Sequence, residues 1–538
     1  MKKTVYLALG LSLAILAACG GGKDKAADSA AAGVTFTVAL DTDITSLDPG
    51  LCWDWDSNQV GAQITEGLLT FDTEGNLAPL LAKSWSQPDD LTYVYEVRDN
   101  VTFSDGSPMT MEDVLFTFNR SRDPEGGSYF SDFFADVESI EATGPWQLTI
   151  KLSQPSAVFK FIPAIAAGWI FSKDYYEKHP DDFGTAMGGV LGTGPFVYES
   201  WINGQEVTLT KNTGYWDKEK LAANIVDRLV FKVIEDDTTR VLAIRNGEVD
   251  YSQLLPPDMI GDVESDPNVT VNHCDSYFMD FLAMNTQRPP FDDVNARRAV
   301  AHALNIPELF TAIIKNAGIP GTALPFGPAL YGADAQKWRD YLNAAEPLYN
   351  LDRAKQYLSQ SSYPNGFNFT LFVSTNSLYQ QMALYIQEAL KQVNINVEIQ
   401  RMSLEEVSAY QMGEYWDGNG KRDYEALIGI WGADYPDLNG NLEFMYVSSQ
   451  AGESGANAAA FVNPRVDELI AEQRTTLDPE KRFAVQTRLI DIITGEAPYL
   501  ILNYELGHGA LSKKYTNLTV TSAGLLWALP IQSVRKAD

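Results

Sequence analysis

The spacing of apolar and polar residues predicts strands that alternate with helices along most of the chain. Thr110 and Asp113 form an N-cap signature that opens one helix. We expect two further helices, through residues 64–69 and over residues 379–392. Continuous or alternating apolar runs, which are typical of strands, lie at residues 34–40, 92–98, 227–233, 281–285, 369–373 and 426–430. This mixture predicts α/β lobes.

One turn comes directly after the buried strand expected over residues 426–430. Its sequence is Trp431-Gly-Ala-Asp-Tyr-Pro-Asp437, so Trp431 stands near the strand end and Asp434 lies in the turn. Pro436 stops further regular structure. A carboxylate held beside an indole at the end of a buried strand suits a cationic group. The pattern also fits a packing role, in which Trp431 fills core and Asp434 caps the turn.

The N-terminus resembles the signal of a bacterial lipoprotein. Two lysines precede an apolar run over residues 5–16, which has signal-peptide length and is too short to span a membrane. The run ends in Leu-Ala-Ala-Cys, so residues 1–18 are expected to be removed and Cys19 to receive lipid. A plain secretory signal with an unrelated cysteine is the alternative. Residues 19–33 are rich in Gly, Ala, Ser and Lys, and this predicts a flexible tether.

Composition narrows the possible functions. With 538 residues, 45% of them hydrophobic, the chain can bury a large core in more than one lobe. The net charge of -31 argues against nucleic acid, because no basic patch is present to neutralise phosphates. The 4 histidines are scattered without metal-ligand spacing, so we expect no metal and no cofactor. Cys52 and Cys274 could pair in an exported protein, but the sequence gives no distance between them.

A series of short motifs runs through nearly all of the chain beyond the tether. Among them are Leu47-Asp-Pro49, Glu66-Gly-Leu-Leu69, Val101-Thr-Phe-Ser-Asp-Gly-Ser-Pro108, Gly192-Thr-Gly-Pro-Phe-Val197, Arg245-Asn-Gly-Glu-Val-Asp250, Asn463-Pro-Arg-Val-Asp467 and Ala497-Pro-Tyr499. Each motif alone is weak, but their order and spacing are specific. Together they resemble the peptide-binding family of ABC-transporter solute receptors, which take oligopeptides, dipeptides and, in some members, nickel or sugars.

The resemblance implies an α/β, periplasmic-binding-protein-like fold with two large lobes around a cleft and an extra inserted subdomain. The two chain crossings between the large lobes, near Asn285 and Asn503, would act as a hinge. The implied parts are lobe I over residues 34–79, 192–285 and 508–538, the inserted lobe II over residues 80–191, and lobe III over residues 286–507.

The resemblance also implies a ligand site. Oligopeptide receptors of the family carry a Trp-x-Ala-Asp-Tyr stretch whose Asp pairs with the peptide α-amino group, and Trp431, Asp434 and Tyr435 match it position by position. A charge-assisted hydrogen bond in a closing, dehydrating cleft is much stronger than at a surface. Without ligand, we expect the Asp434 carboxylate to be solvated.

Four further residues are candidate ligand contacts. Trp53 and Trp55 follow the first strand, where family members place cleft residues, although a surface loop fits them equally well. Tyr277 lies near the crossing into lobe III, where the family offers an aromatic ring. Asn376 stands near the point where some dipeptide receptors have an Arg that grips the ligand carboxylate. The absence of Arg there weakens the dipeptide interpretation.

We therefore predict a monomeric extracytoplasmic receptor, lipid-anchored to the bacterial cell membrane, that delivers an oligopeptide to an ABC permease and ATPase complex. The alternatives are a receptor for a sugar or another small solute, since indoles stack on sugars, and a sensor lipoprotein that feeds no transporter. A hydrolase that uses Asp434 and Asp437 is a further alternative. No nucleophile or metal motif of a hydrolase is found, so we predict a protein that is not an enzyme and assign no catalytic residue.

Overall fold

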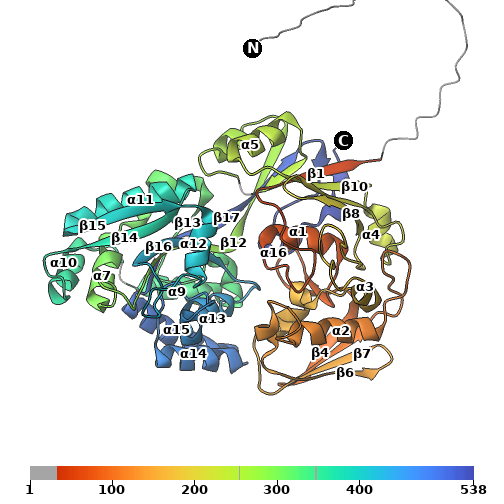
Figure 1. Ribbon diagram of the computed structural model, residues 1–538, viewed down its shortest axis with the longest axis horizontal. Helices are drawn as coiled ribbons and strands as arrows, with labels where there is room; N and C mark the ends of the chain where they lie inside the picture. The colour runs from red at the N-terminus through yellow and green to blue at the C-terminus, as the bar shows by residue number, and fades with distance from the viewer. Residues whose placement is uncertain (1–32, 254, 346–347, 538) are drawn as a thin grey trace, which may run out of the picture. The chain divides into compact units, whose positions relative to one another are not determined.

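The computed structural model describes residues 33–253, 255–345 and 348–537 (Figure 1). The predicted signal peptide, Cys19 and nearly all of the predicted tether lie outside these residues. The chain divides into residues 1–33 and a compact unit, Val34–Asp538, which is described here. Within the described part, no helix is long and apolar enough to cross a membrane.

A mixed 11-stranded sheet runs through the compact unit in the order β15-β14-β16-β12-β17-β11-β1-β10-β9-β8, with β13 paired to β17. Strand β1 pairs in parallel with β10 and β11, whereas β12, β16 and β17 pair antiparallel. The bounds are β1 (Thr35–Leu40), β8 (Phe196–Ile202), β9 (Glu206–Lys211), β10 (Arg228–Val233), β11 (Tyr251–Gln253), β12 (Val269–Met284), β13 (Gly318–Pro320), β14 (Phe367–Ser374), β15 (Ile395–Met402), β16 (Ala426–Gly432) and β17 (Tyr499–Ser512).

The long strands β12 and β17 join the two ends of this sheet. Strand β12 pairs with β16 through its last seven residues, and β17 pairs with β11 near its own end. The ladder between β12 and β17 shifts register between Asp275 and Met279, and such irregularities let a strand bend. Asn503 lies in β17 opposite Asp280, and Asn285 directly follows β12. The hinge positions and the lobe boundaries stay predictions.

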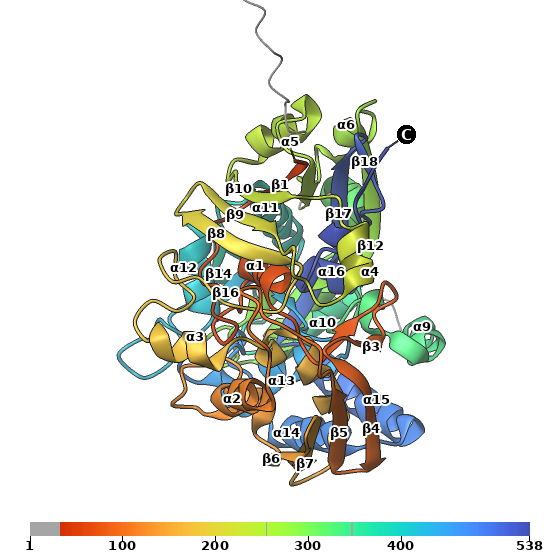
Figure 2. The ribbon, with the colours of Figure 1, turned by 90° about the vertical axis from the view of Figure 1, so that its right-hand side faces the viewer.

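A separate sheet has the antiparallel order β4-β5-β7-β6 and lies within the residues of the predicted insertion. Helix α2 (Met111–Arg122) lies along this sheet (Figures 1 and 2). The predicted cap is confirmed, because the Thr110 hydroxyl accepts from Asp113 N and the Asp113 carboxylate accepts from Thr110 N at 2.8 Å. The strands are β4 (Ala82–Asp89), β5 (Thr92–Val97), β6 (Val137–Gly144) and β7 (Gln147–Leu152).

Helices cover both sheets. Their bounds are α1 (Trp55–Ile64), α3 (Lys173–Lys178), α4 (Lys218–Ala223), α5 (Asp237–Asn246), α6 (Ile260–Glu264), α7 (Val294–Ala303), α8 (Ile306–Leu309), α9 (Ala335–Ala344), α10 (Leu351–Gln360), α11 (Ser377–Leu390), α12 (Leu404–Gln411), α13 (Asn439–Tyr446), α14 (Pro464–Thr475), α15 (Pro479–Glu496) and α16 (Ser522–Leu526). Two small antiparallel pairs are β2 (Leu69–Phe71) with β3 (Leu77–Pro79), and β18 (Tyr515–Thr516) with β19 (Arg535–Lys536).

The apolar core is divided into clusters, each between a sheet and the helices that cover it. One cluster packs α7, α10 and α11 against β14, β15 and β16. A second packs α1 against β1, β9 and β10, and a third joins the four-stranded sheet and α2 to α14 and α15. The helix expected through residues 64–69 is wrong, because α1 ends at Ile64. The backbone at Gly67 instead approaches η2 (Phe159–Ala164), where a Cβ would lie 2.4 Å from the Pro163 carbonyl oxygen.

Candidate ligand-binding site

Three segments that are far apart in the sequence meet at one aromatic surface. Trp55 is the first residue of α1, and its ring centroid lies 5.2 Å from that of Phe278 on β12. Phe278 stands opposite Gly432 of β16 in the antiparallel ladder. A Cβ at Gly432 would lie 2.6 Å from the Phe278 ring, so this close approach requires glycine.

Tyr277, the residue predicted from β12, is placed differently from Phe278. Its side chain is buried, and its hydroxyl lies near Gly75, where an added Cβ would be 3.6 Å from it. Neighbouring residues of a strand point to opposite faces of the sheet. Phe278 therefore takes the position beside Trp55, and Tyr277 lies against the turn between β2 and β3.

Trp431 belongs to the other face of the sheet from Phe278, and its ring packs beside the turn that follows β16. Trp431 stands opposite Met279 in the ladder, as expected for a residue near the end of β16. Its indole N–H donates to the Gly440 carbonyl at 3.2 Å, and its ring centroid lies 5.5 Å from that of Phe444 on α13. These contacts fix the indole beside the turn that carries Asp434.

The two carboxylates of this turn have different surroundings. Asp434 is half-buried, not solvated as expected, and none of the described residues forms a hydrogen bond or ion pair with its carboxylate. Burial raises the pKa of the Asp434 carboxyl to about 7. Asp437 forms two bonds with the Arg482 guanidinium, at 2.6 and 2.8 Å. Burial alone would raise the pKa of Asp437, but Arg482 outweighs it and lowers that pKa.

This difference bears on the hydrolase alternative. A glycosidase needs two carboxylates that both face the substrate. Asp437 is instead held by Arg482, and only Asp434 is free to meet a ligand. The turn therefore offers one half-buried carboxylate without a counter-ion among the described residues, and this arrangement suits the binding of a cation.

Tyr435 packs against the segment assigned to the insertion. Its ring lies parallel to that of Phe161 at 5.6 Å between centroids and edge-on to that of Phe133 at 6.0 Å. The Tyr435 hydroxyl accepts a hydrogen bond from Asn439 Nδ2 at 2.9 Å. Because the side chain is only 1% exposed, it fills an apolar cluster in this conformation. A ligand contact by Tyr435 stays a prediction.

Trp53 and Asn376 lie outside the aromatic surface. Trp53 is 61% exposed. Asn376 is the N-cap of α11, where its side-chain oxygen accepts from Leu378 N at 2.9 Å. Both stay predictions as ligand contacts. Cys52 and Cys274 are free thiols, so the open question of a disulfide is answered against pairing in this structure.

Trp55 was predicted as a ligand contact, and α1 carries one further candidate, Asn58, that sequence reasoning missed. Within the described chain, the Trp55 indole N–H is buried without a hydrogen-bond partner, and both amide atoms of Asn58 are also buried and unpartnered. Buried polar groups are normally paired, so an orphaned group points to a water or a ligand. The two residues are three apart and share a helix face. That spacing after Trp-Asp-Trp was the available signal.

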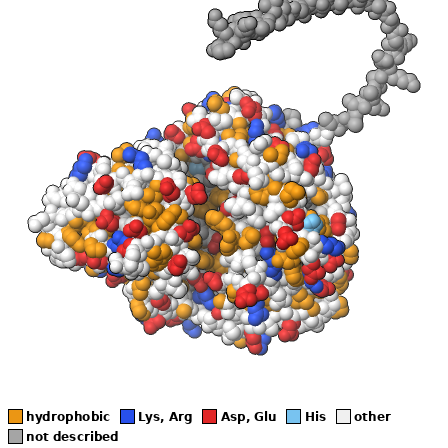
Figure 3. Space-filling model, viewed as in Figure 1, with side chains coloured by type: hydrophobic (Ala, Val, Ile, Leu, Met, Phe, Trp, Pro, Cys, Tyr) orange, Lys and Arg blue, Asp and Glu red, His pale blue; other side chains and the backbone are white. Residues whose placement is uncertain are grey.

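Figure 3 shows that the surface is hollowed between the half that carries α7, α10 and α11 and the half that carries α1 and α2, with hydrophobic side chains in the walls. A mixed sheet whose two ends are joined by two long strands, with a hollow between the halves, is the arrangement expected of a binding protein of the periplasmic type.

Comparison with known proteins identifies the family. The profile of the bacterial extracellular solute-binding proteins, family 5 (Middle), matches residues 76–453. The chain belongs to this family, because the match covers more than half of its length. Members are extracytoplasmic binding proteins that take peptides or small solutes and work with an ABC permease and ATPase. The protein is thus a solute receptor of this class.

Individual relatives agree in fold and length. The chain is 26% identical over 522 residues to the glutathione-binding protein GsiB of Escherichia coli K12, covering 97% of this chain and 96% of the relative. It resembles DppA of Helicobacter pylori in complex with the peptide STSA, with a TM-score of 0.78, 24% identity and coverage of 94% and 98% of the two chains. AppA of Bacillus subtilis in complex with a nonapeptide gives a TM-score of 0.78, 20% identity and coverage of 94% and 99%.

Proposed function

We propose that the receptor binds an oligopeptide whose α-ammonium group pairs with Asp434. The observation that carries the proposal is the half-buried Asp434 carboxylate, which lacks a counter-charge among the described residues. A charge held in such a place favours a ligand cation, because leaving it unpaired costs free energy. The names of the relatives support the ligand class, since GsiB is a glutathione-binding protein and DppA and AppA were solved with peptides.

Groups on α1 and β12 are further candidate contacts for a peptide. The Asn58 amide offers an NH₂ donor group and an oxygen acceptor, which together complement the C=O and N–H of a peptide group. The Trp55 indole N–H adds a donor, and the rings of Trp55 and Phe278 offer apolar surface to a ligand side chain. Receptors that read a ligand backbone gain affinity without strong side-chain selectivity.

A second candidate is a receptor for a non-peptide solute with a cationic or polar group, which the indole and phenyl rings of Trp55 and Phe278 favour. Mass spectrometry of ligand that co-purifies with the exported protein separates the two candidates. Titration calorimetry with free and N-acetylated peptides then tests the ammonium contact. Recovery of a sugar, together with no binding of any peptide, would refute the peptide proposal and leave the receptor class intact.

Peptide affinity is expected to peak between about pH 7 and pH 8. Below about 7, the pKa of Asp434, proton uptake removes the anionic partner, so the association constant should fall roughly tenfold per pH unit. Above about 8 the peptide α-ammonium loses its own proton. Calorimetry across this range measures the profile. Asp434→Asn should lose the acidic limb, and an acidic limb that persists in this variant would assign it to another group.

We also propose that Cys19 anchors the mature protein through lipid. Cys19→Ala should move the protein from the membrane fraction to the periplasm or the medium, with peptide affinity unchanged, because the site lies far along the chain. Fractionation and immunoblotting measure the distribution. A variant that stays in the membrane fraction would show that another feature holds the protein there.

A further inference from the structure

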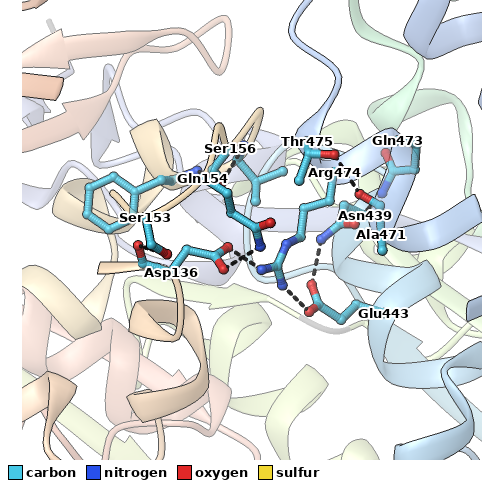
Figure 4. A network of polar contacts seen from close by, with 12 residues as sticks. Asp136, Ser153, Gln154, Ser156, Asn439, Glu443, Ala471, Gln473, Arg474 and Thr475 are labelled. Atoms are coloured by element: carbon cyan, nitrogen blue, oxygen red, sulfur yellow. Dashed lines mark hydrogen bonds and ion pairs between the residues drawn. The ribbon is translucent and has the colours of Figure 1, made fainter. Parts of the chain in front are cut away.

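A polar network joins the turn of Asp434 to the segment assigned to the insertion (Figure 4). Its centre is Arg474 on α14. One guanidinium nitrogen donates to Glu443 Oε1 on α13 at 2.8 Å, and the other donates to Asp136, directly before β6. The backbone oxygen of Arg474 also accepts from Ala157 N at 2.8 Å. Arg474 therefore contacts two segments that lie far apart in the sequence.

The acceptor side of this contact is held in place. Gln154 Nε2 donates to the second carboxylate oxygen of Asp136 at 2.7 Å, and the Asp136 backbone oxygen accepts from Ser153 N at 2.8 Å. The side chains of Arg474 and Asp136 are 19% and 16% exposed. The ion pair is thus much less exposed than a surface pair such as Arg488 with Glu472, whose side chains are 52% and 46% exposed.

A continuous set of hydrogen bonds runs from Arg474 to the turn that carries Asp434. Glu443 Oε2 accepts from Asn439 Nδ2 at 2.7 Å, and the same amide nitrogen donates to the Tyr435 hydroxyl at 2.9 Å. Tyr435 directly follows Asp434, and its ring stacks on Phe161 of the inserted segment. The orientation of the turn is therefore tied to the Arg474–Asp136 ion pair.

A cavity of about 40 Å³ lies beside the pair, lined in part by Ser156, Tyr435, Glu443 and Arg474. It is large enough for water and carries polar groups that would bond water. Access of water lowers the cost of separating the two charges, because the ions exchange one another for solvent. The contact is thus suited to form and break repeatedly.

We propose that Arg474 is a positioning residue whose ion pair with Asp136 joins the two sides of the hollow, favours the closed form with and without ligand, and orients the turn that carries Asp434. The role of the turn rests on the proposed function, whereas the closing contact does not. Each complex must form this contact and must break it before ligand leaves. Loss of the pair should therefore act mainly on the rate of ligand release.

The test compares wild type with Arg474→Gln, Asp136→Asn and the double variant, using trialanine as the probe and stopped-flow kinetics. Each single variant should raise the dissociation rate about fivefold and change the association rate less than twofold, as for a partly shielded ion pair. The double variant should lose little more than Arg474→Gln alone, because that variant already removes the pair with Asp136. Arg474→Lys should restore part of the loss.

The matched control is Arg488→Gln, which breaks the exposed pair with Glu472 on α14 and should leave both rates unchanged. A dissociation rate that is unchanged in Arg474→Gln, or additive effects in the double variant, would overturn the proposal. A lower melting temperature with unchanged release would indicate a role in stability alone, and would overturn it as well.

A second measurement keeps this test separate from the peptide assignment. Small-angle scattering of wild type and Arg474→Gln without added ligand should give a larger mean radius of gyration for the variant, because the closing contact is weakened. If trialanine binds neither protein, the radii of gyration alone test the proposal. Equal radii of wild type and Arg474→Gln would refute the closing contact. A larger radius of Arg474→Gln would support that contact and reject only the proposal that the ligand is a peptide.

Discussion

Asp434→Asn is expected to weaken peptide binding by roughly 30-fold or more. Asparagine keeps the shape of the side chain but removes its charge, so the ligand ammonium would be buried without a counter-ion. The cost of truncating one partner of a buried charge pair is about 2–5 kcal/mol. Titration calorimetry with one unmodified peptide measures the loss.

N-acetylated peptides are the control for that variant. They lack the ammonium, so they should bind wild type weakly and lose little further in Asp434→Asn. Asp437→Asn is the matched control within the turn: it should lower thermal stability through loss of the Arg482 bonds and leave the preference for free amines intact. Equal affinity of wild type and Asp434→Asn for a free peptide would mean that Asp434 does not bind the ammonium and is only a turn residue.

The same carboxylate affects stability without ligand. Its pKa in the folded protein is about 7, above the usual value near 3.9. The folded protein therefore holds the proton more tightly than the unfolded chain, and stability from this group is fully present below about pH 4 and lost as the pH rises through about 7. Asp434→Asn should remove this pH dependence, and its melting temperature at pH 8 should be higher than that of wild type. Sequence reasoning expected a solvated carboxylate and hence little change.

Local patterns in the sequence were enough for much of the fold. Strands β1, β5, β10, β14 and β16 are confirmed where apolar runs predicted them, because a buried strand needs little more than such a run between turns. The cap at Thr110 is confirmed for the same reason, since its partner Asp113 is three residues away. Trp431 lies near the end of β16 as predicted, but Pro436 does not stop regular structure, because β16 already ends at Gly432 and α13 begins at Asn439.

Long-range packing decided what the sequence could not. Whether Tyr277 or Phe278 faces Trp55 depends on the register of β12 with β16 and on the irregularity that begins at Asp275. Resemblance pointed to Asp434, but only the fold separates it from Asp437, because the arginine that neutralises Asp437 lies on another helix. No local pattern carries that information.

Arg422 shows the same limit on a larger scale. It is 1% exposed and precedes β16, and none of the described carboxylates pairs with it. Its guanidinium instead donates to backbone carbonyls at the end of α12 and in the segment after α13, including Gln411 at 2.7 Å and Gln450 at 3.1 Å. A basic residue with only carbonyl partners gives no signal in the sequence, although it joins the end of α12 to the loop after α13.

Arg422→Leu is expected to cost about 3–5 kcal/mol of stability, because several buried carbonyls lose their donor at once. Arg422→Lys should be similarly unstable, since one ammonium cannot reach all the carbonyls that the planar guanidinium binds. Thermal melting measures the loss, and hydrogen exchange should show reduced protection first around residues 410–413 and 450–455, before the rest of the unit opens. Arg488→Leu is the control, because its pair is exposed and its loss should be nearly neutral. A melting temperature of Arg422→Leu equal to that of Arg488→Leu would mean that water replaces the guanidinium at these carbonyls. The end of α12 and the segment after α13 would then be held by their other contacts.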